Sequence, residues 1–342
     1  MTTSSPISLT SRRHRVAETI ARTRELSIVV IILVVFFATA MKTSGFANLT
    51  SIQQILTNAS LLLLLAVGET AVIVTRNVDL SVGSTLGMSA FLVGDLYTHV
   101  PNAPIWLAFV VGIGVGVVAG ALIGIIVAFA KVPSLVVSLA ALYIIRGVLN
   151  TIGLGIQIEP SAIPMSLQKI GFETVAGVPW IFVIAMGIAI IAAYAMRSFR
   201  SSRELYAIGS NPDAARLAGV PVARRVLSAF VLSGALAGLG GVLFVSEFAT
   251  VNATAGTGYE LLVVASCVIG GVAIFGGSGT AIGAAFGAIL LQVINQSLVV
   301  VNVSPFWDQA LAGALILITI AFDRIVSNRA ALALRLKGAS NG

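Results

Sequence analysis

The sequence predicts an all-α, polytopic membrane bundle of about ten transmembrane helices. Apolar side chains make up 58% of the 342 residues and charged side chains only 10%, whereas about a quarter of the residues in an ordinary soluble domain are charged. Apolar stretches long enough to cross about 30 Å of hydrocarbon recur along the chain. A soluble chain of this length could not bury so much apolar surface, so we expect the bilayer to be its solvent.

The predicted spans are ten apolar stretches bounded by charged residues, glycine or proline. They cover residues 27–41, 55–74, 80–97, 105–130, 132–149, 179–196, 226–247, 260–276, 281–300 and 308–325. This division gives a cytoplasmic tail at 1–26, a transmembrane domain at 27–325 and a second cytoplasmic tail at 326–342. The longest charged segment, 197–225, forms a cytoplasmic loop between the sixth and seventh spans.

The distribution of basic residues supports an even number of spans. Seventeen of the 20 Lys and Arg residues fall in the tails and loops that ten spans place on one side. Lys42 and Lys169 lie on the other side, and Arg146 lies near the outer end of the fifth span, where its side chain can snorkel. Because cytoplasmic loops are rich in Lys and Arg, both termini are predicted to be cytoplasmic.

The N-terminus also has some features of a cleavable signal peptide. Arginines precede an apolar run that ends near Ala38-Thr39-Ala40, as at a small-residue cleavage site. We favour an uncleaved first span, since its removal would leave an odd number of spans, whereas the other basic residues support an even number.

Several function classes find no support in the sequence. The basic residues lie between apolar runs and are not clustered with aromatics, so nucleic-acid binding is not expected. Cys267, His14 and His99 are too few for a Cys- or His-based metal centre, and no cofactor is expected. The stretch 276–279 is glycine-rich but lacks the Lys-Ser/Thr of a phosphate loop. We therefore expect neither a catalytic centre nor ATP binding in this chain.

Glycines at four-residue intervals form a smooth face on two predicted spans. Small residues let membrane helices approach closely, because the hydrophobic effect does not drive association in lipid. The sequence therefore predicts helix packing, rather than nucleotide binding, for Gly112, Gly116, Gly120 and Gly124 in the fourth span and for Gly283 and Gly287 in the ninth.

Within the 197–225 loop, capping signals predict a two-turn helix at 212–218. Asn211 suits the N-cap, Pro212 the first helical position, and Gly219 the end of the helix. A docking surface and an ordinary solvated loop both remain open on these signals alone.

Polar residues inside apolar runs are candidates for a translocation path, because ionisable groups at membrane depth are costly. Hydrogen bonding between helices explains such residues equally well. The candidates are Asn58, Ser60, Glu69, Asp79, Ser81, Glu260, Gln292, Asn295 and Gln296. Asp79-Leu80 and Glu260-Leu261 each open a small, apolar stretch, which faintly indicates an inverted repeat.

Three blocks of the sequence, in order, resemble the permeases of ribose-type ATP-binding-cassette importers. These are residues 75–84 (TRNVDLSVGS); 204–212 (ELYAIGSNP) with 214–220 (AARLAGV); and 256–261 (GTGYEL) with 268–271 (VIGG) and 276–279 (GGSG). The resemblance spans about residues 45–325. Arg76-Asn77, Ser266-Cys267 and Asn295-Gln296 depart from the ribose-type pattern and look more like permeases of autoinducer-2 and rhamnose importers.

The resemblance implies a multi-pass permease of the bacterial inner membrane that carries a small sugar or sugar-like solute. It implies three partners: cytoplasmic ATP-binding subunits that hydrolyse ATP, a second permease copy or a sister permease, and a periplasmic solute-binding protein. In family members the 204–220 segment faces the ATPase. The resemblance therefore implies that the residues coupling the permease to the ATPase are Glu204, Tyr206, Asn211, Pro212, Ala215, Arg216 and Gly219. A secondary transporter in which Glu69 or Glu260 binds a coupling proton or sodium ion is the alternative.

Overall fold

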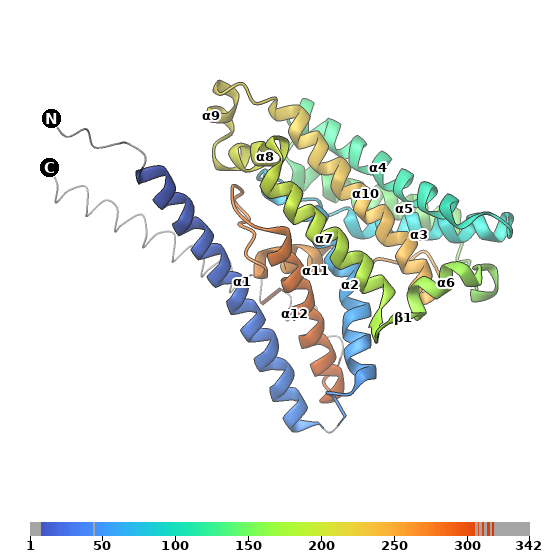
Figure 1. Ribbon diagram of the computed structural model, residues 1–342. Helices are drawn as coiled ribbons and strands as arrows, with labels where there is room; N and C mark the ends of the chain where they lie inside the picture. Colours follow the sequence, from blue (N-terminus) through green and yellow to red (C-terminus); the bar gives the residue numbers. More distant parts are fainter. Residues whose placement is uncertain are drawn as a thin grey trace, which may run out of the picture.

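The computed structural model describes residues 8–43 and 45–304 and a few positions between 307 and 317, with α1 side chains described from Glu25 onward. Helices dominate this part of the chain (Figure 1). The long helices are α1 (Ser8–Lys42), α2 (Leu49–Ile73), α3 (Val82–His99), α4 (Ile105–Phe129), α5 (Ser134–Gly153), α7 (Trp180–Ser198), α10 (Val222–Phe248) and α12 (Ala281–Val300). The shorter elements are η1 (Pro160–Ala162), α6 (Met165–Phe172), β1 (Thr174–Val175), β2 (Val178–Pro179), α8 (Arg200–Ser210), α9 (Pro212–Leu217) and α11 (Tyr259–Ile269).

Seven of the described helices are long and apolar enough to cross a membrane: α1 from Glu25, α2, α4, α5, α7, α10 and α12. These and the 18-residue α3 correspond to eight of the ten predicted spans, and the mostly helical bundle confirms the predicted fold class. The tenth predicted span, 308–325, lies outside the described residues apart from isolated positions. The predicted C-terminal tail, 326–342, lies outside them too, whereas residues 8–26 of the predicted N-terminal tail form the first part of α1.

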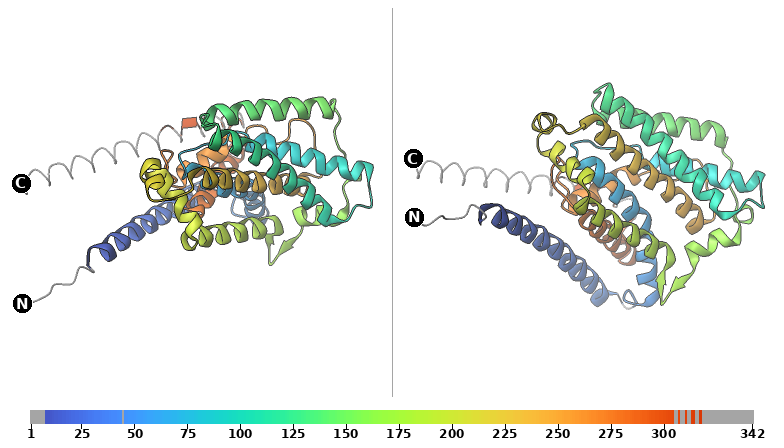
Figure 2. Two further views of the ribbon diagram at one scale, coloured as in Figure 1. Left: turned by 90° about the horizontal axis from the view of Figure 1, so that it is seen from above. Right: turned by 45° about the horizontal axis from the view of Figure 1, so that its top comes forward.

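Helix α2 is the central helix of the bundle, and the five leucines at 61–65 are all at most 1% exposed. Helices α7, α10, α11 and α12 pack around it. Helix α1 contacts the bundle on α12, where the Thr39 hydroxyl is 3.0 Å from the Ser297 hydroxyl. The first part of α1 projects beyond the bundle (Figure 2).

The predicted glycine face of α4 packs directly on α10. A Cβ atom added to Gly116 would overlap the carbonyl oxygen of Gly234, and one added to Gly112 would meet Val242 and the carbonyl of Gly238. Gly120 and Gly124 continue the contact against Phe230 and Leu227. The two backbones are therefore as close as glycine allows. Gly283 and Gly287 serve the same purpose where α12 meets the end of α11, opposite Gly270 and Ser266.

The eighth predicted span, 260–276, is wrong in its length. Helix α11 has 11 residues and ends at Ile269, which is too short for about 30 Å of hydrocarbon. Residues 270–279 form a glycine-rich loop instead, and the N–H of Gly277 donates to the carbonyl of Val74 at the end of α2. Hydropathy alone treats a short helix and an apolar loop as one stretch.

The starts of α3 and α11 meet inside the bundle. The chain turns back after α2 and opens α3 beside Glu69, whereas residues 249–258 fold back from the end of α10 and open α11. A Cβ atom on Gly83 would touch the carboxylate of Glu260 and overlap the carbonyl of Gly256. Two helices that begin inside the bundle after oppositely directed returns form the pattern of an inverted repeat, in agreement with the faint Asp79/Glu260 signal.

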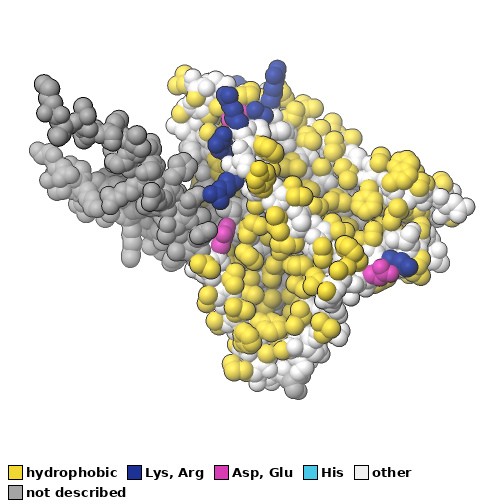
Figure 3. Space-filling model, in the orientation of Figure 1, with side chains coloured by type: hydrophobic (Ala, Val, Ile, Leu, Met, Phe, Trp, Pro, Cys, Tyr) yellow, Lys and Arg dark blue, Asp and Glu magenta, His cyan; other side chains and the backbone are white. Residues whose placement is uncertain are grey.

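The two ends of the bundle differ in character. Helices α8 and α9 stand at one end, and η1, α6 and the β1–β2 hairpin cover the other (Figure 1). In the view of Figure 3, most of the visible Lys and Arg side chains gather near α8 and α9, and the surface between the two ends is largely apolar.

Candidate functional site: the α8–α9 segment and the buried polar residues

Helix α9 is capped as the sequence predicts. The Asn211 side chain accepts hydrogen bonds from the N–H groups of Asp213 at 3.1 Å and Ala214 at 3.0 Å, and Pro212 occupies the first turn. Gly219 follows with a φ of +79°, a conformation that favours glycine. Both ends of this six-residue helix are thus fixed by local chemistry, one residue short of the predicted C-terminus.

Arg76 joins the end of α8 to the turn after α2. Its guanidinium donates to the carbonyl oxygens of Gly209 and, at 2.7 Å, Ser210, the last carbonyls of α8, which lack partners within the helix. Arg76 itself has a φ of +67°. Glycine would adopt this positive φ without strain, and the two hydrogen bonds show what arginine contributes here.

A third segment, the loop between α11 and α12, is bound to the same place. The Tyr206 hydroxyl donates to the Gly279 carbonyl at 2.9 Å, and burial raises the pKa of Tyr206 to about 12. A Cβ atom on Gly209 would overlap the carbonyl of Val74. Helix α8 is therefore held against two turns that lead directly into α3 and α12.

Glu204 connects α8 to the base of α10. Its carboxylate accepts hydrogen bonds from Arg225 at 2.6 Å and from Arg200 at 3.0 Å. The hydrogen bond from Arg225 is the main reason why the pKa of Glu204 lies below its ordinary value, and Arg200 lowers it further. Glu204 therefore supports the position of α8 against α10.

The exposed face of α9 carries Leu217 and Arg216, not Ala215. Ala215 is only 4% exposed and packs inward, whereas Leu217 is 92% exposed. Arg216 is also exposed and forms an ion pair with Asp213 at 3.6 Å. Sequence reasoning missed Leu217, although an apolar residue two positions before the terminating glycine was a usable signal.

Glu69, Asp79 and Ser81 lie together where α3 begins. One Glu69 carboxylate oxygen accepts the N–H of Asp79 at 2.9 Å, and Asp79 accepts both the N–H and the hydroxyl of Ser81. The second Glu69 oxygen is buried and has no hydrogen-bond partner among the described residues. The three side chains thus order the turn that opens α3.

Glu260 has a comparable place at the start of α11. Its carboxylate lies 3.2 and 3.3 Å from the N–H of Gly258. Arg146 does not snorkel to the surface as expected, because it donates to the carbonyls of Ala253 at 3.0 Å and Ala255 at 2.7 Å in the returning loop. The returning loop is not helical, so its carbonyl oxygens lack partners within a helix, and Arg146 supplies hydrogen bonds to two of them.

The other residues that the sequence suggested for a translocation path do not lie beside the carboxylates of Glu69, Asp79 and Glu260. Ser60 is buried and donates to Leu56 of its own helix. Asn58 on α2 and Gln292, Asn295 and Gln296 on α12 are half-buried. The described part of the chain contains no cluster of three or more potential metal ligands.

A multi-pass helical bundle with helices that begin inside it, joined to a stiff basic segment at one end, is the architecture of a membrane permease. A family model described as "Branched-chain amino acid transport system / permease component" matches residues 51–320. The chain belongs to this family.

Curated relatives carry a more specific description. The "Autoinducer 2 import system permease protein LsrC" of Salmonella paratyphi B is 33% identical over 304 residues, covering 89% of this chain and 87% of the relative. The protein of the same name from Escherichia coli O157:H7 is 32% identical over 318 residues, covering 93% and 91% of the two chains. No solved structure matches the chain.

Proposed function

We propose that this chain is the membrane-spanning subunit of an ATP-binding-cassette importer, and that it carries autoinducer-2 or a similar small sugar-like solute into the cytoplasm. Family membership supports the permease role, and the LsrC relatives support the solute class. The permease has no catalytic role of its own and needs no cofactor. Its proposed partners are two cytoplasmic ATP-binding subunits, a second permease and a periplasmic solute-binding protein.

The α8–α9 segment is the observation that carries the proposal. A force applied to α9 reaches α3 through Arg76, α10 through Glu204 and Arg225, and α12 through Tyr206 and Gly279. Rigid links of this kind transmit the motion of a partner to several spans at once. Leu217 offers the partner an apolar contact at the tip.

The same segment supports the proposed orientation. Its exposed arginines belong on the cytoplasmic side by the positive-inside rule, which places Arg146 and the returning loop toward the periplasm. Both termini are then cytoplasmic, as the sequence predicts.

The secondary transporter remains a second candidate because of Glu69. Its second carboxylate oxygen is buried and has no hydrogen-bond partner in the described part of the chain, so it could bind a coupling proton or sodium ion. The hydrogen bond to Asp79 also gives this residue a purely structural role, so we place the candidate second.

Uptake by reconstituted vesicles distinguishes the ATP-driven importer from the secondary transporter. The permease is reconstituted with its ATPase and its solute-binding protein, and solute uptake is measured with ATP inside the cytoplasmic compartment or with an imposed proton or sodium gradient. The proposal expects uptake that requires ATP and is insensitive to ionophores. Uptake driven by a gradient without ATP contradicts it.

A further inference from the structure

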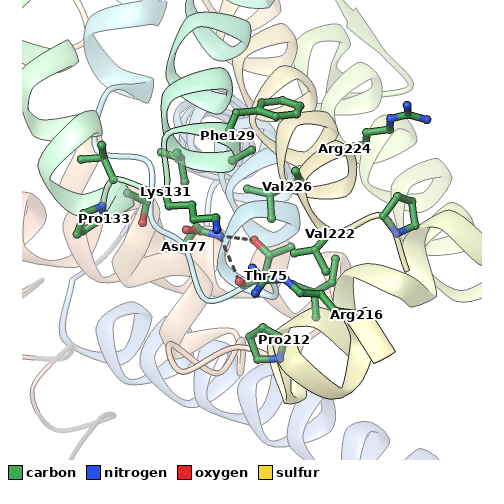
Figure 4. A pocket seen from close by; sticks show the side chains of 17 residues that line it. Thr75, Asn77, Phe129, Lys131, Pro133, Pro212, Arg216, Val222, Arg224 and Val226 are labelled. Carbon is green, nitrogen blue, oxygen red and sulfur yellow. Dashed lines mark hydrogen bonds between the residues drawn. The ribbon is translucent and has the colours of Figure 1, made fainter. Parts of the chain in front are cut away.

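A basic pocket lies at the α8–α9 end of the bundle. It has a volume of about 900 Å³ and is enclosed by the turns after α2 and α4 and by the segment from α8 to the start of α10 (Figure 4). Lys131, Arg216 and Arg224 contribute to its lining, and no acidic residue does. In Figure 4, Arg224 points away from the pocket at its rim.

An apolar groove runs along the surface of α3, between α4 and α5. Its volume is about 990 Å³, and apart from Thr85 its lining is aliphatic or glycine, with one methionine. Gly114 opens into it, because a Cβ atom there would meet nothing within 4 Å. Val118, Leu122 and Ile144 along its walls are about 60% exposed, so the groove faces the hydrocarbon.

The groove and the pocket meet at the turn between α4 and α5, since Val132 lines both. Lys131 precedes it and is exposed, and no ion pair of Lys131 occurs among the described residues. Ser134 begins α5 on the same turn. Its Oγ accepts the N–H of Val78 at 3.1 Å, so its own hydroxyl hydrogen can donate to a ligand.

We propose that this continuous site binds an anionic phospholipid, with the phosphate at Lys131 and Ser134 and an acyl chain in the groove of α3, α4 and α5. Basic pockets between helices at the cytoplasmic surface suit anionic headgroups. A second copy of the chain fits less well, because a symmetric contact would bring the like charges of two pockets together. Arg216 lines the pocket from α9, so the lipid would also steady the α8–α9 segment.

The test uses the purified full-length permease in detergent, titrated with phosphatidylglycerol or phosphatidylcholine of equal chain length. Bound lipid is counted by native mass spectrometry. We expect phosphatidylglycerol to bind at least about tenfold more tightly, because phosphatidylcholine offers the same phosphate but adds a choline cation that the basic pocket repels. Lys131→Asn, which tolerates the positive φ of 57° at this position, should abolish most of this preference. Arg203→Gln removes an equal charge from the exposed side of α8, outside the pocket lining, and should leave the preference unchanged.

The groove is tested by Gly114→Leu, which fills it, and by the matched control Gly187→Leu on α7, where a Cβ atom also meets nothing within 4 Å. Gly114→Leu should weaken binding of both lipids severalfold, and Gly187→Leu should not. Short-chain phosphatidylglycerol should bind the unaltered permease more weakly than the long-chain lipid, which tests the groove without any variant.

Three results overturn the proposal. One is a headgroup preference that survives Lys131→Asn. Another is displacement of the lipid by soluble glycerol phosphate at comparable concentration, which would make the pocket a solute site. The third is a dimer that Gly114→Leu dissociates while lipid binding persists, which would assign the groove to a second copy.

Discussion

Replacing Gly116 by alanine tests the packing of α4 on α10 with the smallest change available. The added Cβ atom would lie well inside 3.0 Å of the Gly234 carbonyl oxygen, closer than real Cβ atoms come to a neighbour. Both contacting groups are helix backbone and cannot rotate away. The helices must therefore separate along the whole contact from Gly112 to Gly124.

The expected cost follows from two opposing effects. Overpacking of a tight interior costs about 1–3 kcal/mol, and separation would also loosen the neighbouring glycine contacts. Alanine gains about 1 kcal/mol in helix propensity over glycine. Gly114→Ala lies two residues away on the same helix and meets nothing within 4 Å, so it receives the gain without the cost. The two variants should thus change stability in opposite directions.

The assay is the thermal unfolding of each purified variant in detergent, followed by the loss of the monodisperse peak in size exclusion. With about 2–4 °C per kcal/mol for a chain of 150–250 residues, we expect the Tm of Gly116→Ala to fall several degrees below that of Gly114→Ala. Equal Tm values, or a more stable Gly116→Ala, would refute the close contact of α4 with α10.

The remaining predictions concern single polar groups. Arg76→Gly relieves the positive φ but removes the hydrogen bonds to Gly209 and Ser210, worth about 1.5–3 kcal/mol each as bonds to a charged group, so amide exchange at 209–211 should accelerate; unchanged exchange would contradict the clamp. The pKa of Glu204 is lowered, so its contribution is complete above the ordinary value of about 4.3 and disappears as pH falls through the folded value. The Tm difference between the unaltered chain and Glu204→Gln should therefore stay constant from pH 7 to 5 and vanish in stronger acid, and a difference that grows in acid would reverse this sign. Glu69→Gln should leave ATP-driven uptake largely intact, since only a gradient-coupled carrier needs that carboxyl to exchange a proton; a folded variant without uptake would favour the secondary transporter.

Local signals in the sequence predicted the helices and their close contacts well. The four-residue glycine spacing placed Gly116 on the face that meets α10, because a period close to 3.6 keeps such residues on one side of a helix. The cap at Asn211 was equally readable, since it depends only on residues within one turn.

Features that depend on contacts between distant segments could not be predicted from the sequence. The eighth span appeared continuous because the loop after Ile269 is as apolar as a helix, and its contact with Val74 is long-range. Arg146 looked like a snorkelling residue, since nothing near it in sequence reveals the carbonyls of Ala253 and Ala255. The burial of Ala215 and the exposure of Leu217 could not be predicted either, because six residues carry too little periodicity to separate the two.

The central claim is that a partner ATPase drives this permease through α9, and Leu217→Glu tests it most directly. Burial of one leucine side chain in an interface is worth about 1.5–3 kcal/mol, and a carboxylate in its place adds a desolvation cost. Met165→Glu on α6, at the opposite end of the bundle and 65% exposed, adds the same charge as a control. The measurement is co-purification of the tagged permease with its ATPase, together with solute-stimulated ATP hydrolysis in vesicles. The account predicts that Leu217→Glu assembles in the membrane but loses the ATPase and the stimulation, while Met165→Glu keeps both. Full retention of both by Leu217→Glu would contradict it.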